Sequence, residues 1–251
     1  MSSLRIAAAQ SVSVPGRVTA NVATHCRFIE EAATAGVDIL VFPELSLSGY
    51  ELPLLRTCAV QPDDAVLAPI RELVCSTGMT VVVGAPVLLG TERARIGAIT
   101  FFPDGHSGIY CKQYLHPGEE VFAEPGEFGS PVHKICGETC AIAICADTAH
   151  AEHAQAASDA GASLYLASVL VSEAGYPTDS ALLHSYATRH EMATLMSNHG
   201  GAPGGYVSAG RSAFWSPYGT LVVAAPDAGS YLVVASRSTD GWSGELIPIG
   251  T

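Results

Sequence analysis

Runs of consecutive apolar residues alternate along the chain with segments in which apolar residues recur every three or four positions. The runs predict strands buried in a sheet, and the wider spacing predicts amphipathic helices. Strands are predicted at residues 5–9, 37–42, 80–87, 97–102, 107–112, 139–145, 163–167, 194–198, 212–216, 220–224 and 230–235. Helices are predicted from residue 18 to a stop at Gly36, and at residues 64–76, 150–160 and 180–191. This alternation predicts an α/β domain with mixed sheets.

Turn residues divide the pattern without breaking it into separate units. Pro103-Asp104-Gly105 joins strands 97–102 and 107–112 as a predicted hairpin. Residues 113–131 are polar and rich in Pro, Gly and Glu, which predicts a long loop of the kind that often carries function. Because the sequence has no repeat, low-complexity tract or linker, residues 1–251 are expected to form a single domain.

The composition of the chain excludes a disordered protein and argues against two classes of binding partner. Hydrophobic residues make up 48% of the chain and charged residues 14%, which excludes a disordered protein. Twelve Lys and Arg stand against 24 Asp and Glu, a net charge of −12, which argues against binding to nucleic acid or to an anionic membrane. No apolar run approaches the roughly 20 residues of a membrane span. The apolar stretch near the start of the sequence is too short for a secretory signal. We therefore expect a cytoplasmic protein.

The seven cysteines are an odd number in a large chain without a signal segment, so structural disulfides are not expected. Most of these thiols are expected to be small buried hydrophobes. One of them is then available as a nucleophile.

Three candidate residues lie at the ends of predicted strands, the edge at which sites form in α/β proteins. Glu44 follows strand 37–42, Lys112 ends strand 107–112, and Cys145 ends strand 139–145 before a predicted helix. Each also has an ordinary interpretation, as an exposed carboxylate, a surface lysine or a core thiol. However, a helix N-terminus stabilises a thiolate, and a nucleophilic thiol needs a base and oxyanion donors. A carboxylate and an ammonium would supply both.

The segments around these residues resemble the motifs of the nitrilase superfamily, the carbon–nitrogen hydrolases. The matching segments are Val41-Phe42-Pro43-Glu44 running to Ser48-Gly49-Tyr50, Tyr110-Cys111-Lys112-Gln113-Tyr114-Leu115-His116, and Ile144-Cys145-Ala146-Asp147 running to Glu152. They occur in the family's order, and later segments extend the resemblance over almost the whole chain. The resemblance implies a four-layer α-β-β-α sandwich, an assembly into a homodimer or higher homo-oligomer, and no cofactor.

The resemblance also implies a mechanism of acyl transfer. Cys145 would attack the carbonyl carbon of an amide, and Glu44 would act as general base. Lys112 and the backbone N–H of Ala146 would stabilise the oxyanion. Ammonia or an amine would leave, and water would then release the acid.

Three further residues are expected to support this site. Glu119 stands where the family has a further glutamate that would hold Lys112 and the substrate, although the adjacent Glu120 leaves the register open. Tyr50 is expected either at the pocket or in the core. His150 is expected to line the pocket. A zinc site formed by His150 and His153 is not expected, because the ammonium of Lys112 would repel a metal ion.

The resemblance implies a small-molecule substrate, and two features of the sequence bear on the charge of that substrate. Ala149 stands where several relatives carry an arginine for an acidic substrate group, which weakens the case for a carboxylate-bearing substrate. Acidic residues in segments near the expected pocket favour a neutral or amine-bearing amide, unless they are simply solvated; they are Glu120, Glu124, Glu173 and Asp179. An amidohydrolase acting on a small amide or N-carbamoyl amine is therefore the leading prediction.

Three alternatives stay open. A nitrilase would use the same triad on a small nitrile, although nitrilases commonly have a longer chain. A non-catalytic binding protein could keep the same scaffold, although the presence of all three triad residues argues against it. A domain that supplies ammonia to a synthetase would be expected to carry a fused synthetase domain, which these 251 residues lack, but a separate partner would serve equally.

Overall fold

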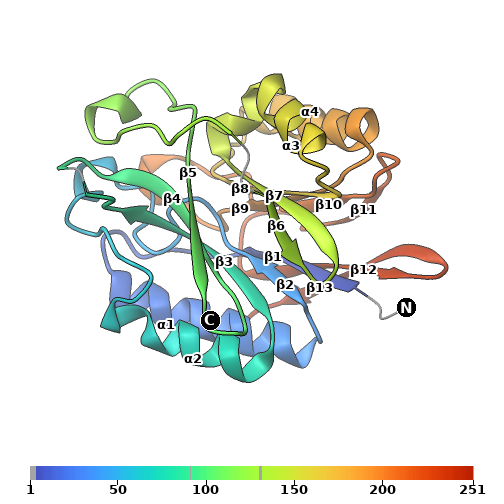
Figure 1. Cartoon of the computed structure of the whole chain (residues 1–251), viewed down its shortest axis with the longest axis horizontal. Coiled ribbons are helices and arrows are strands. Elements are labelled where there is room, and N and C mark those ends of the chain that lie inside the picture. Colours follow the sequence, from blue (N-terminus) through green and yellow to red (C-terminus); the bar gives the residue numbers. More distant parts are fainter. Residues whose placement is uncertain (1–3, 91, 130–131, 251) are drawn as a thin grey trace.

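Two β-sheets pack face to face at the centre of the computed structural model, and helices cover both outer faces (Figure 1). The structure describes residues 4–90, 92–129 and 132–250. In this part of the chain, a seven-stranded sheet has the order β13-β12-β1-β2-β3-β4-β5, and a six-stranded sheet has the order β11-β10-β9-β8-β7-β6. The predicted four-layer α-β-β-α sandwich is confirmed.

The larger sheet is parallel at its centre and antiparallel at both sides. Its strands are β1 (Leu4–Gln10), β2 (Ile39–Val41), β3 (Thr80–Val87), β4 (Arg95–Phe101), β5 (Ser107–Cys111), β12 (Tyr231–Ser238) and β13 (Gly241–Pro248). β1, β2 and β3 run parallel, and the remaining neighbours pair antiparallel. β4 and β5 form the hairpin that the turn at residues 103–105 predicts.

The smaller sheet repeats this plan. Its strands are β6 (Val132–Ile135), β7 (Glu138–Ile144), β8 (Leu164–Val169), β9 (Ala193–Asn198), β10 (Ala213–Trp215) and β11 (Leu221–Ala224). The central strands β7, β8 and β9 run parallel. β2 and β7 therefore both have parallel neighbours. In α/β proteins, sites form at the carboxyl ends of such strands.

Helices form the two outer layers. The helices are α1 (Val18–Thr34) and α2 (Ala68–Thr77) on the larger sheet, and α3 (Ala151–Asp159) and α4 (Tyr176–His190) on the smaller one (Figure 1). Short 3₁₀ turns lie at η1 (Leu52–Leu54), η2 (Ala65–Leu67), η3 (Glu119–Val121), η4 (Cys145–Ala149) and η5 (Pro203–Gly205). No helix of the described residues is long and apolar enough to span a bilayer.

Each interface between layers is a separate apolar cluster. Ile6 and Val41 meet Ile142 and Leu166 between the sheets. Residues Val22, Ile29 and Ala32 of α1 are buried against the larger sheet, as their helical spacing predicts. Leu183, Tyr186 and Ala187 of α4 pack with Tyr165 and Met196 on the smaller sheet. Burial of apolar area on both faces of each sheet explains the continuous apolar runs of the central strands.

Several predicted boundaries were wrong, each for a local reason. The strand predicted at 37–42 is shortened at both ends to β2, because the Val37 N–H bonds back to the Ala32 carbonyl of α1 and Pro43 has no N–H to continue the ladder beyond Phe42. Cys145 begins the turn η4 instead of ending strand β7. The fourth helix begins at Tyr176, four residues earlier than predicted, with Pro177 in its first turn.

The edge strands β6 and β13 were not predicted at all. β13 begins with Gly, Trp, Ser, Gly and Glu and is largely exposed, so it lacks the apolar run of a central strand. The predicted loop at 113–131 contains the short turn η3, and its last two residues lie outside the described residues, as do residues 1–3, 91 and 251.

Candidate active site

Glu44 is held at the carboxyl end of β2 by contacts from the opposite sheet. Ser197 on β9 donates a hydrogen bond of 2.8 Å to the carbonyl of Val41, and Ser168 on β8 donates one of 2.8 Å to the carbonyl of Phe42. The ring Nε2 of His199 donates one of 2.7 Å to the carbonyl of Glu44 itself. These contacts fix the backbone that carries the Glu44 carboxylate, which is fully buried.

The turn that carries Glu44 lies directly against β3. A Cβ atom at Gly84 would come within 2.1 Å of the Pro43 carbonyl oxygen, so only glycine fits at that position. The following residue, Leu45, adopts a left-handed backbone with φ of 51°. This backbone geometry turns the chain sharply out of the sheet immediately after the carboxylate.

Lys112 lies one residue beyond β5 and is also fully buried. Its Nζ donates hydrogen bonds to Oε1 of Glu44 at 2.6 Å and to Oε1 of Glu119 at 2.8 Å. Burial alone would lower the pKa of Lys112, but the surrounding negative groups raise it above its usual value. The side chain is therefore a permanent ammonium between two carboxylates.

Glu119, and not its neighbour Glu120, enters this cluster. η3 turns the Glu119 side chain inward, where Oε1 accepts a 2.5 Å hydrogen bond from the hydroxyl of Tyr50 and Oε2 accepts one of 2.8 Å from the His116 backbone. Glu120 is exposed. Tyr50 is buried and also lines the cavity described below, so both interpretations of this tyrosine hold.

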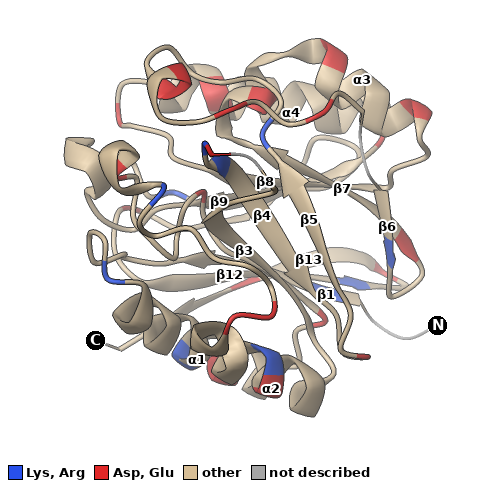
Figure 2. Ribbon diagram, turned by 60° about the vertical axis from the view of Figure 1, so that its left-hand side comes forward, with Lys and Arg blue, Asp and Glu red and all other residues tan. Residues whose placement is uncertain are grey.

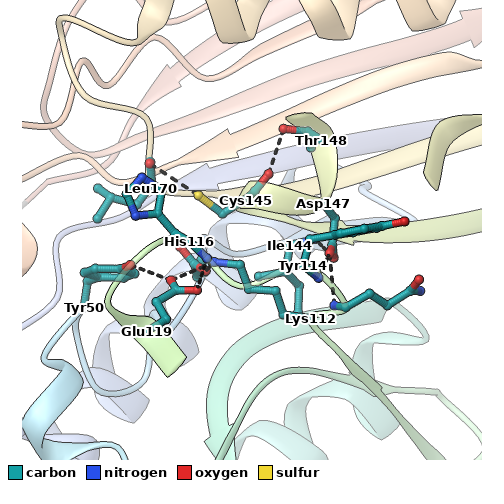
Figure 3. A network of polar contacts seen from close by, with 12 residues as sticks. Tyr50, Lys112, Tyr114, His116, Glu119, Ile144, Cys145, Asp147, Thr148 and Leu170 are labelled. Carbon is teal, nitrogen blue, oxygen red and sulfur yellow. Dashed lines mark hydrogen bonds and ion pairs between the residues drawn. The ribbon is translucent and has the colours of Figure 1, made fainter. Parts of the chain in front are cut away.

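Cys145 begins the turn η4 directly after β7, with φ of 44°. A left-handed backbone at a residue other than glycine costs on the order of 1–3 kcal/mol and is commonly kept where a side chain must be aimed. The Sγ atom points toward the carbonyl of Leu170 at 3.6 Å, and the Cys145 carbonyl accepts a 2.8 Å hydrogen bond from Thr148 (Figure 3). Burial raises the pKa of the thiol, so Cys145 is protonated at neutral pH.

The two oxygens of the Glu44 carboxyl group differ in their hydrogen bonds. Oε1 accepts from Lys112, whereas Oε2 is buried and accepts no hydrogen bond from the described residues. Burial raises the pKa of Glu44 to about 7, against opposing effects from Lys112 and the nearby Cys145 thiol. A carboxylate with a free oxygen, a pKa near neutrality and a thiol beside it is able to accept a proton from that thiol.

Asp147 connects the cysteine turn to the lysine segment. Its Oδ1 accepts hydrogen bonds of 3.0 Å from the backbone N–H groups of Gln113 and Tyr114, and its Oδ2 accepts one of 3.0 Å from Ile144 (Figure 3). The hydroxyl of Tyr110 donates a further bond of 2.7 Å to Oδ2. One buried carboxylate therefore sets the position of Lys112 relative to Cys145.

Replacing Asp147 by Asn should destabilise the fold by about 3 kcal/mol and lower kcat/KM about 10- to 100-fold. The Asn amide would turn an NH2 group toward donors that then lack an acceptor, and a small displacement of catalytic groups is costly. Urea unfolding and amide hydrolysis would measure the two effects. Asp159→Asn, at the exposed end of α3, is the matched control. An Asp147→Asn variant as stable and active as that control would contradict this role.

A cavity of about 350 Å³ opens above Cys145. It is lined by Tyr50, His116, Cys145, Ala146, Thr148, Ala149, Leu170, Val171, Ser172, Gly175, Asp179 and Tyr206. This volume suits a small organic molecule. Its walls come from η4, the segment after β8 and the start of α4, as well as from the loops that carry Tyr50 and His116.

The structure brings Glu44, Lys112, Glu119 and Cys145 into one cluster, with Tyr50 and Ala146 on the cavity wall. His150 was predicted to line the pocket, but it is not among the residues that line this cavity. Its ring stacks on that of Tyr114, with the ring centroids 3.7 Å apart. Thr148 and Ala149 line the cavity instead.

The structure also gives no support to a metal at the histidine pair. Both ring nitrogens of His153 already make hydrogen bonds of 2.8 Å, to Tyr110 and Tyr165. Within residues 4–90, 92–129 and 132–250, no group of three or more His, Cys, Asp and Glu side chains is arranged to hold a metal ion.

Comparison with known proteins agrees with this geometry. A family model described as carbon-nitrogen hydrolase matches residues 5–242. Among curated proteins, a nitrilase of Pyrococcus abyssi is 26% identical over 125 residues, 48% of this chain and 47% of that protein. A glutamine-dependent NAD(+) synthetase of Xylella fastidiosa is 32% identical over 162 residues, 57% of this chain and 27% of that protein. The matched segments thus span about half of the first relative and about a quarter of the second.

Solved structures match over nearly the whole chain. An amidase from Nesterenkonia sp. AN1 is 26% identical, with a TM-score of 0.85 and coverage of 92% of this chain and 91% of that chain. A variant of the same amidase, 25% identical with a TM-score of 0.85, carries acrylamide added at its active-site cysteine. A further variant, bound to butyramide, has the same fold, with a TM-score of 0.86 at 24% identity.

Proposed function

Because the chain belongs to the carbon–nitrogen hydrolase family, we propose that it is an amidase that hydrolyses a small amide through a thioester on Cys145. The observation that carries this proposal is the position of Cys145 on the wall of a small cavity, beside a buried Glu44 that has one free oxygen. The similarity to an amidase, a variant of which carries acrylamide added at its active-site cysteine, supports the same reaction class.

The first half-reaction forms the thioester and releases the amine. Glu44 takes the proton of the Cys145 thiol as sulfur bonds to the carbonyl carbon of the substrate. The ammonium of Lys112 and the backbone N–H of Ala146 stabilise the oxyanion. Glu44 then passes the proton to the leaving nitrogen, the C–N bond breaks, and ammonia or an amine departs.

The second half-reaction restores the enzyme. Glu44 removes a proton from water, whose oxygen bonds to the thioester carbon. The C–S bond breaks, the proton returns to sulfur, and the acid leaves. Glu119 takes no proton in this scheme. It holds Lys112 in place together with Tyr50, through the contacts described above.

The pH dependence of the reaction should report the ionisation of Glu44. Because the raised pKa of Glu44 lies at about 7, its ionised and active fraction increases as pH rises toward that value. We expect kcat/KM to rise about tenfold per pH unit below pH ~6.5 and to level off above pH ~7.5. Steady-state kinetics on butyramide between about pH 5 and pH 9 would measure this profile. A profile that is flat from about pH 5.5 to pH 7 would contradict the assignment of Glu44 as the base.

The proposed activity is tested by following ammonia release and whole-protein mass together. The substrates are short aliphatic amides, N-carbamoyl amines and nitriles, and peptide mapping would locate any adduct. We expect an acyl mass increase on Cys145 with amides, and none on Cys75 or Cys136, which are exposed thiols outside the cavity. Turnover of nitriles alone would indicate a nitrilase. Absence of turnover and adducts with every compound would indicate a binding protein on this scaffold.

A homodimer and a cytoplasmic location stay predictions of the sequence. Light scattering coupled to size-exclusion chromatography would test the first. Supply of ammonia to a separate synthetase would require a partner, which co-purification would reveal.

A further inference from the structure

The cavity beside Cys145 carries one acidic side chain on its wall. Of the four acidic residues that the sequence placed near the pocket, Asp179 lines the cavity, whereas Glu120, Glu124 and Glu173 do not. Among the described residues that line it, none is a lysine or an arginine. The lining also includes the apolar side chains of Ala149, Leu170 and Val171.

The Asp179 carboxylate has no partner within the described part of the chain. No side chain or backbone group there donates a hydrogen bond to it, and none forms an ion pair with it. Its neighbour Glu173, by contrast, lies 3.6 Å from Arg211, and Glu119 is bonded to Lys112. Asp179 is half-buried, and this burial raises the pKa of its carboxyl group above the usual value. A half-buried carboxylate without a donor is poorly solvated, and a bound cation would stabilise it.

Asp179 reaches the cavity from the first turn of α4. Its carboxylate lies near Gly175 and Ser172, both of which also line the cavity. A Cβ atom at Gly175 would come within 3.0 Å of Oδ2 of Asp179, so the carboxylate rests against that glycine. The absence of a side chain at Gly175 leaves space in front of the carboxylate.

We propose that Asp179 selects substrates that carry a primary ammonium group at the end opposite the scissile amide. This inference rests on the proposed amidase function. The carbonyl of such a substrate lies at Cys145, its methylene groups lie along Leu170 and Val171, and its ammonium donates hydrogen bonds to Asp179. A carboxylate at the same end of the substrate is repelled, since no lining arginine or lysine offsets the acid.

The negative charge around the cavity also favours a cationic substrate. The loop at residues 113–129 carries four glutamates and no lysine or arginine, and acidic segments predominate in the loops above the sheets (Figure 2). Two carboxylates and one ammonium meet below the cavity. With a net charge of −12, the protein attracts cations toward an opening of this kind.

Matched pairs of substrates test the proposal, because an ammonium group replaces a methyl group of the same size. The pairs are 3-aminopropanamide with butanamide, 4-aminobutanamide with pentanamide, and 5-aminopentanamide with hexanamide, with succinamate as the anionic analogue. The cationic member of at least one pair should have the higher kcat/KM, and succinamate should be the poorest substrate. The series covers the chain length that reaches Asp179.

Asp179→Asn is the decisive variant. It should lower the ratio of kcat/KM for the cationic over the neutral member about 10- to 100-fold, chiefly through KM, as expected for the loss of a charge-assisted hydrogen bond. Asp159→Asn, the same change at an exposed site on α3, should leave the ratio unchanged. Asp179→Lys should reverse the preference toward succinamate. Thermal unfolding of each variant verifies that it is folded.

Two failures are distinguishable. If amides acylate Cys145 but the ratio is the same in the wild type and in Asp179→Asn, the inference is overturned and the amidase stands. If no amide acylates Cys145, the proposed function fails, and the inference fails with it. A wild-type preference for the neutral member of every pair would also overturn the inference.

Discussion

Replacing Cys145 by alanine should abolish turnover of every amide, with a loss in kcat on the order of 10⁶-fold, the scale set by deletion of a nucleophile in other acyl-transfer enzymes. The buried carboxylates and the ammonium below the cavity cannot form a covalent intermediate without the thiol. Without the thioester, water would have to attack the amide carbon directly, in a site arranged for attack by the sulfur of Cys145.

The same variant should keep the fold and the cavity. Alanine removes one atom from a partly exposed side chain, and it leaves the Asp147 contacts with the backbone of Gln113, Tyr114 and Ile144 in place. We therefore expect an unfolding free energy within about 1 kcal/mol of the wild type. Calorimetric titration with butyramide should still detect binding, now without ammonia release.

Cys75→Ala is the matched control, because Cys75 is an exposed thiol on α2, on the larger sheet's helical layer. It should retain full turnover. Retention of more than about 1% of the wild-type rate in Cys145→Ala, after contamination is excluded by a second preparation, would contradict the covalent mechanism.

The sequence predicted the central cluster because its residues stand in contiguous motifs at strand ends. Glu44, Lys112 and Cys145 each follow a strand whose apolar run marks where the sheet ends. Their side chains meet because the carboxyl ends of β2, β5 and β7 lie at one side of the two packed sheets (Figure 1). The register of Glu119 was harder to predict, since two adjacent glutamates on a loop differ only in which one η3 turns inward.

The contacts that anchor this cluster were not predictable from local patterns. Ser168, Ser197 and His199 reach from the smaller sheet to the backbone around Glu44, over 126 to 156 positions along the chain. A serine in an apolar strand gives no sign of its partner in the opposite sheet. Burial lowers the pKa of His199 to about 4, so its ring is neutral, and its Nε2–H is free to donate to the Glu44 carbonyl.

Asp179 illustrates the same limit for the cavity. The sequence placed four acidic residues near the pocket, but it could not tell a lining carboxylate from one paired with Arg211 or exposed on a loop. That difference depends on where α4 begins, and the helix starts four residues earlier than its apolar spacing predicts. The substrate-facing end of the site thus depends on a boundary, which is the least certain feature of a sequence pattern.

Replacing Lys112 by methionine should destabilise the fold by about 3–5 kcal/mol, in addition to abolishing hydrolysis. Methionine keeps the length of the side chain but leaves Glu44 and Glu119, both fully buried, without their shared cation. Removing one partner of a buried ion pair costs more than the pair contributes, because the remaining charge is left unsolvated. Lys134→Met, at an exposed position on β6, is the control and should change stability by less than about 0.5 kcal/mol.

The sign of the pH dependence separates this explanation from a simple packing defect. Lys112 acts to lower the pKa of Glu44, so its removal raises that pKa further above the value in the unfolded chain. A carboxyl group with a raised pKa in the folded state binds a proton there, and its contribution to stability is lost as pH rises through that pKa. The deficit of Lys112→Met should therefore be larger at pH ~8 than at pH ~5.5 in urea unfolding.

A second substitution tests the same cause. Adding Glu119→Gln to Lys112→Met removes one of the two buried charges, and it should recover part of the lost stability at pH ~8 while activity stays absent. Glu119→Gln alone should destabilise the protein, since it removes a negative charge that balances Lys112 and turns an NH2 group toward one of the three donors that Glu119 accepts from. A double variant no more stable than Lys112→Met, with a deficit independent of pH, would show that the lysine contributes through packing rather than through its charge.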